Sequence, residues 1–66
     1  MNVTYPDVEV ELIGHDGNAI GIIGKVSRAI RRAHGHDAGT DFVNQATQCG
    51  SYDELLALVM RTVEVS

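Results

Sequence analysis

Four cationic side chains recur at helical spacing in the first half of this chain and are its clearest candidates for binding chemistry. On a helical wheel of 100° per residue they fall opposite an apolar stripe, and two glycines share their side. This predicted basic face consists of Lys25, Arg28, Arg31 and Arg32, with Gly21 and Gly24 beside them. Such a face can contact phosphates or a partner protein. The simpler interpretation is a solvated helix face whose cations, near the helix C-terminus, favour the helix dipole.

The two glycines favour a binding role for this face. A glycine in the middle of an exposed helix costs about 1 kcal/mol relative to alanine. Close approach of another backbone, from a protein or a phosphate chain, would explain both, as would a frayed first turn. The run from Ile20 to Ile30 also resembles the Ile-Gly-x-x-Gly run of KH modules, where a Gly-x-x-Gly loop clamps nucleic acid. Here the intervening Ile22 and Ile23 belong to the apolar stripe, which disfavours a KH loop.

Other reactive side chains form weaker patterns. His34-x-His36 followed by Asp37 has metal-ligand types, but zinc sites need three or four ligands at defined spacing. Cys49 lacks the surroundings of a nucleophile and is typical of a small buried residue. The Gly14 to Gly17 turn lacks a phosphate-loop spacing. We therefore expect no catalytic residue, no metal site and no cofactor.

The elements that carry these residues follow from periodicity. Val8, Val10 and Leu12 alternate with polar positions, which predicts a strand over 7–13 with Glu9 and Glu11 on its outer face, although Pro6 interrupts the ladder before it. Residues 14–17 are a turn, and Asn18 is placed to cap the helix over 18–33, which ends at Gly35. The apolar stripe of that helix is expected to contain Ala19, Ile22, Ile23, Val26, Ala29, Ile30 and Ala33.

The second half of the chain predicts two further helices and a strand. After a connection over 36–39, a helix over 40–48 is expected, capped by Thr40 or Asp37, with Phe42, Val43, Ala46 and Cys49 facing inward. Ser51 to Glu54 is a capping box that opens a helix over 52–61. Its inner face should hold Leu55, Leu56 and Val59. The pattern does not decide whether Leu58 and Met60 also turn inward. Residues 63–65 alternate as a short strand. The prediction is an α+β fold, β-α-α-α-β, with a small two-stranded sheet packed by three helices.

Length and composition limit the function classes. The 66 residues are expected to form one small domain over 1–66, with 44% hydrophobic residues, a single cysteine and a formal net charge of −4. An unpaired thiol suits a reducing cytoplasm, and no apolar run approaches the length of a membrane span. The net charge disfavours non-specific binding to polyanions by the whole molecule. A chain this short also offers little volume for a substrate pocket.

Two motifs in order carry a resemblance to known proteins. They are the Gly-His-Asp-Gly-Asn-Ala turn of residues 14–19 and the Ser-Tyr-Asp-Glu-Leu-Leu helix start of residues 51–56, followed by a Val-Glu-Val end. Over roughly residues 8 to 65 the chain resembles a family of small uncharacterised bacterial, plasmid and phage proteins, many of them actinobacterial. The resemblance implies a phage or mobile-element setting and an intracellular protein. It implies no activity, cofactor or site residue.

These observations predict a non-catalytic protein-interaction module that binds a host protein or itself. The alternative is a nucleic-acid-binding protein that uses the basic face of the helix over 18–33. Self-association is expected through strand edges, which glutamates otherwise blunt, because two strands alone are marginally stable. The charge distribution discriminates between the two functions: neutralisation of the basic face by Asp37 and Asp41 would favour a protein partner.

Overall fold

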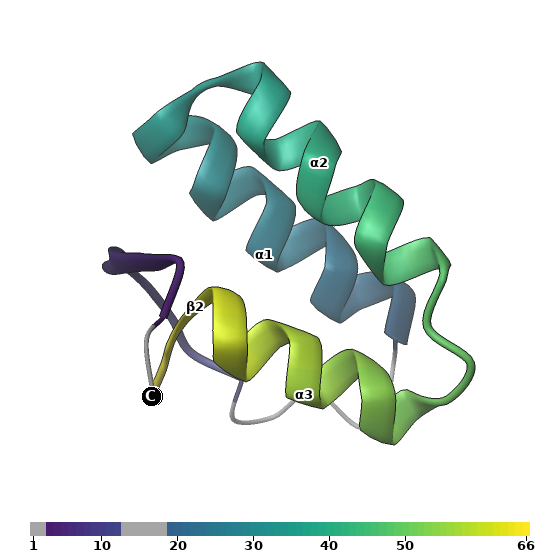
Figure 1. Cartoon of the computed structure of the whole chain (residues 1–66). Helices are drawn as coiled ribbons and strands as arrows, with labels where there is room; N and C mark the ends of the chain where they lie inside the picture. The colour runs from purple at the N-terminus through teal and green to yellow at the C-terminus, as the bar shows by residue number, and fades with distance from the viewer. Residues whose placement is uncertain (1–2, 13–18) are drawn as a thin grey trace.

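The computed structural model of the chain, which describes residues 3–12 and 19–66, has the element order β-α-α-α-β (Figure 1). The elements are β1 (Tyr5–Val10), α1 (Ala19–His34), α2 (His36–Thr47), α3 (Tyr52–Thr62) and β2 (Val63–Val65). The predicted α+β class, with a two-stranded sheet and three helices, is confirmed. The predicted turn over 14–17 and the Asn18 cap lie outside the described residues.

Helices α1 and α2 are joined by one glycine. Gly35 has a φ of 98°, a left-handed conformation that glycine adopts without strain, and its N–H donates to the Arg31 carbonyl at 2.9 Å. Because α2 begins at His36, the predicted connection over 36–39 is wrong, and so are the predicted Thr40 and Asp37 caps. Packing of Gly39 against Ser27 and Arg31 of α1 holds these residues in a helix that local propensity alone does not favour.

Helix α3 begins at the predicted serine cap and continues directly into β2. The Ser51 hydroxyl accepts a hydrogen bond from the Glu54 N–H at 3.2 Å. The Glu54 carboxylate reaches back one residue further than in a standard capping box and accepts from the Gly50 N–H. At the other end, Val63 is extended and starts the strand.

The two strands pair in parallel, a direction that their sequences left open. The register places Glu9 beside Glu64 and Val10 beside Val65, with an irregularity between Tyr5 and Glu9. The predicted strand over 7–13 is therefore shifted: β1 starts at Tyr5 and ends at Val10. Pro6, which donates no backbone hydrogen bond, lies within the irregular part, where the ladder tolerates it.

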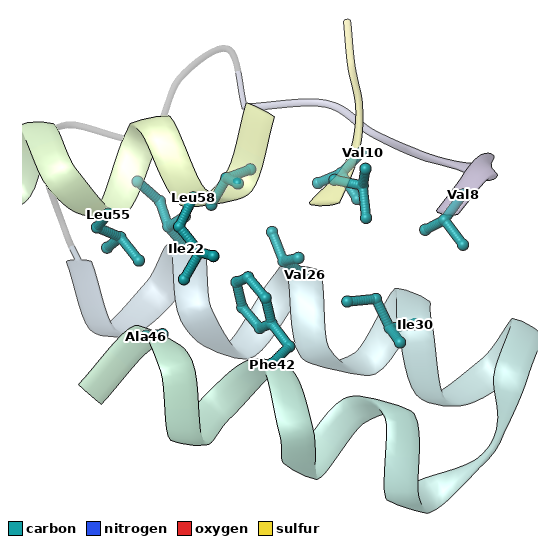
Figure 2. Packing of buried hydrophobic residues seen from close by; sticks show 11 residues of the cluster. Val8, Val10, Ile22, Val26, Ile30, Phe42, Ala46, Leu55 and Leu58 are labelled. Carbon is teal, nitrogen blue, oxygen red and sulfur yellow. The ribbon is translucent and has the colours of Figure 1, made fainter. Parts of the chain in front are cut away.

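The core lies between two layers, one formed by α1 and α2 and the other by α3 and the strands (Figure 2). Phe42 of α2 points into the centre, toward Ile22 and Val26 of α1. The buried hydrophobic side chains are Val8, Val10, Ile22, Val26, Ile30, Phe42, Ala46, Leu55, Leu58, Val59 and Val63. The helical pattern did not decide whether Met60 turns inward, and its side chain is 62% exposed.

Candidate functional site

Helix α1 has a buried side and a cationic side. Ile22, Val26 and Ile30 are buried in the core. The opposite side carries what we call the cationic face, in which three arginines are exposed and the lysine is half-buried. Its members are Lys25, Arg28, Arg31 and Arg32. The structure agrees with the helical wheel, because these side chains lie on the side of α1 that faces away from the core.

No carboxylate within residues 3–12 and 19–66 neutralises the cationic face by direct contact. Among the described residues the one ion pair joins His34 to Asp7, so no cation of this face has a carboxylate oxygen within 4.0 Å. Asp37 and Asp41, whose neutralisation of this face would have favoured a protein partner, are exposed on α2. At helical spacing they lie on the side of α2 opposite its buried residues, which are Gly39, Phe42 and Ala46.

The two glycines of α1 lie inside the helix. Gly24 has open space where a Cβ would be, with no atom within 4 Å, and Gly21 is half-buried. Because both are helical, residues 20–30 form no KH-type loop. The fold supplies no internal reason for a glycine at position 24.

Ile20, which belongs neither to the predicted apolar stripe nor to the predicted basic face, adds an apolar side chain to the same side of α1. It is 82% exposed, the most exposed large hydrophobic residue in the part of the chain that the structure describes. Ile20, Gly24 and Arg28 follow at intervals of four, so they form one row along the helix. The available signal was its position on the helical wheel, outside the arc of the apolar stripe.

A tight contact joins α1 to α2, and we call it the α1–α2 seam, formed by Ser27, Arg31 and Gly39. A Cβ on Gly39 would lie 3.0 Å from the Ser27 backbone oxygen and 3.3 Å from the Arg31 Cβ. Ser27 is buried, and its hydroxyl donates to the Gly24 carbonyl at 3.1 Å. The aliphatic part of Arg31 therefore packs over Gly39, while the residue stays exposed.

His34 and His36 form separate contacts instead of a shared site. His34 Nε2 lies 3.0 Å from Asp7 Oδ1, and the His34 ring lies against that of Tyr5, with ring centroids 4.5 Å apart and the planes tilted by 33°. His36 Nε2 lies 3.4 Å from the Thr40 hydroxyl. In the parts of the chain that the structure describes, no group of three or more His, Cys, Asp or Glu side chains could hold a metal ion.

Two shallow hollows flank Cys49, one of about 330 Å³ between α2 and α3 and one of about 310 Å³ near the start of α1. The first contains Glu54 and Arg61 as its charged residues. The Glu54 carboxylate already accepts from Gly50, and the Cys49 thiol donates to the Gln45 carbonyl at 3.6 Å. The thiol and the carboxylate at the first hollow are thus each engaged with a backbone partner.

Comparisons with known proteins give no match: no family model, no curated protein and no solved structure is similar to this chain. The resemblance to small bacterial, plasmid and phage proteins stays a prediction. Over residues 3–12 and 19–66, no helix is long and apolar enough to cross a membrane.

Proposed function

We propose that this chain is a non-catalytic interaction module that binds a protein partner, a host protein or a second copy, through the cationic face of α1. The observation that carries the proposal is a row of cations on the side of α1 away from the core, none of which is paired with a carboxylate of the described residues. Unpaired arginines on a rigid helix are suited to an acidic partner surface, because their charge complements it and their position is fixed in advance.

The composition of this face supports a protein partner. Ile20 exposes an apolar side chain and Gly24 leaves the backbone accessible, in the same row as Arg28. Apolar groups beside arginine are typical of protein interfaces, where arginine is enriched. The net charge of −4 also opposes the approach of a nucleic acid to the molecule as a whole.

Nucleic-acid binding is the second candidate, and one observation favours it. Within the described residues, Asp37 and Asp41 form no ion pair with the cationic face. Such ion pairs would have favoured a protein partner over a nucleic acid. A phosphate backbone would then contact the exposed Arg28, Arg31 and Arg32. The affinity for nucleic acid would fall as salt is added. A plot of the logarithm of the binding constant against the logarithm of the salt concentration would have a slope close in magnitude to the number of phosphates contacted.

Capture from a bacterial lysate to which free chain has been added tests the proposal, because the lysate supplies the bacterial host partner that the family resemblance implies and the free chain supplies a second copy. Immobilised wild-type chain is compared with Arg28→Glu and with the matched control Arg61→Glu, which makes the same charge change on α3. We expect wild type and Arg61→Glu to retain the same proteins after nuclease treatment, and Arg28→Glu to lose them. Complete loss of capture after nuclease would favour the nucleic-acid candidate. Equal capture by Arg28→Glu would exclude the cationic face.

A further inference from the structure

The sheet carries a charge opposite to that of α1, on the opposite side of the molecule. In β1 and β2 the buried Val8, Val10 and Val63 pack into the core, while the glutamates that alternate with them are exposed. We call Glu9, Glu11 and Glu64 the acidic sheet face. The core lies between this face and the cationic face, because each points away from the side chains that its own element buries.

The acidic sheet face is also uncompensated. Glu9 and Glu64 are register partners on adjacent strands, so two carboxylates lie side by side. None of the three glutamates forms an ion pair within the described residues. Like charges on neighbouring strands destabilise a sheet, and an external cation would relieve that cost. The molecule thus presents two unneutralised surfaces of opposite sign.

The backbone edge of β1 is a less suitable contact than this face. Pro6 lacks a donor, the ladder is irregular between Tyr5 and Glu9, and the acidic side chains repel a second copy of the same edge. Charged residues and proline are the usual protection of edge strands. Self-association through strand edges alone is therefore disfavoured by the residues that the structure places there.

We propose that a second copy of this chain is the partner, and that its acidic sheet face docks on the cationic face of α1. This inference rests on the proposed function, since it names the partner of that same face. The two surfaces differ, so the contact is head-to-tail and each copy keeps one free face. Association can then continue beyond a dimer, into short chains or a closed ring.

Sedimentation of the full chain at two salt concentrations tests the contact. Raising the salt from about 0.1 M to about 1 M shortens the screening length from about 10 Å to about 3 Å. We expect the average mass to rise with protein concentration at the lower salt and to return to the monomer at the higher salt. The variant Arg28→Glu should weaken association by about tenfold or more, whereas Arg61→Glu should leave it nearly unchanged.

A charge exchange distinguishes this contact from general electrostatics. The variants Arg28→Glu/Arg32→Glu and Glu9→Arg/Glu64→Arg should each be monomeric and folded by circular dichroism. An equimolar mixture of the two should associate again, because each supplies the complement of the other's altered face. A wild-type chain that stays monomeric at the lower salt, or a mixture that stays monomeric, would overturn the inference. The proposed function is decided separately, by the nuclease-treated capture with Arg28→Glu.

Discussion

Two regions that flank helix α1 use glycine in opposite ways. In the α1–α2 seam, Gly39 is buried and a Cβ there would be tight, since it would lie 3.0 Å from a backbone oxygen. On the outer side of α1, Gly24 faces open space and no neighbour fills the position of its missing side chain. Each glycine weakens its helix by about 1 kcal/mol relative to alanine. Only at Gly39 does close packing inside the fold offset this cost.

The difference shows which features of the chain serve folding and which do not. Ser27 and Gly39 are explained by the close approach of two helices. Gly24, the exposed Ile20 and the unpaired cations have no such explanation within the described residues. We therefore interpret the seam as structural and the outer side of α1 as the surface available to a partner.

The largest expected effect tests the two sides of α1 directly. Val26 is fully buried in the core, so Val26→Asp would bury an unpaired carboxylate. The cost of about 4 kcal/mol or more is comparable to the whole stability of a domain this small. We expect circular dichroism to show an unfolded chain, whereas Arg28→Asp should melt within a few degrees of wild type. A cooperative, unchanged melt of Val26→Asp would remove the basis of the assigned core.

The next effect tests the seam. Gly39→Ala should lower the free energy of unfolding by about 1–2 kcal/mol, because α1 and α2 must separate slightly to admit the Cβ. Gly39→Val should lower it further, since its branches extend toward Ser27 and Arg31. Urea denaturation measures both changes. An increase in stability for Gly39→Ala would show that the seam has space to spare.

On the outer side of α1, replacing glycine by alanine is expected to change the free energy of unfolding in the opposite direction. Gly24→Ala should raise the free energy of unfolding by up to about 1 kcal/mol, because alanine is the better helix former and meets no neighbour. The same variant should reduce partner capture if the partner approaches the backbone closely. Thermal melting and capture, measured on one preparation, separate the two effects. A destabilised Gly24→Ala would mean that the position has a role inside the fold.

The smallest effect concerns the acidic sheet face. Glu64→Lys should raise the free energy of unfolding by about 0.5 kcal/mol, because it replaces repulsion with Glu9 by attraction across the strands. The gain should shrink as salt increases. Glu11→Lys, beyond the last strand pair, is the control and should change stability less. Equal effects of the two substitutions would argue against the Glu9–Glu64 register.

Much of the fold could be predicted because it depends on local patterns. The predicted helix over 18–33 ends one residue before α1 does, since apolar periodicity and Gly35 mark it, while its first position, Asn18, lies outside the described residues. The Ser51 cap and the alternation of Val8 and Val10 were predicted for the same reason. The candidate site was predicted in part: the helical wheel separated its cations from the core, but the absence of ion pairs depends on how α2 is oriented.

The order and type of the elements and the two-sided character of α1 follow from the amino-acid pattern, because hydrophobic period and capping act within a few residues. Tertiary packing sets the parallel pairing of Glu9 with Glu64, the burial of Ser27 and the contact of His34 with Asp7. Each joins segments that are distant along the chain or sets how tightly two helices pack. Such contacts depend on the shape of the assembled layers, and no local propensity encodes that shape.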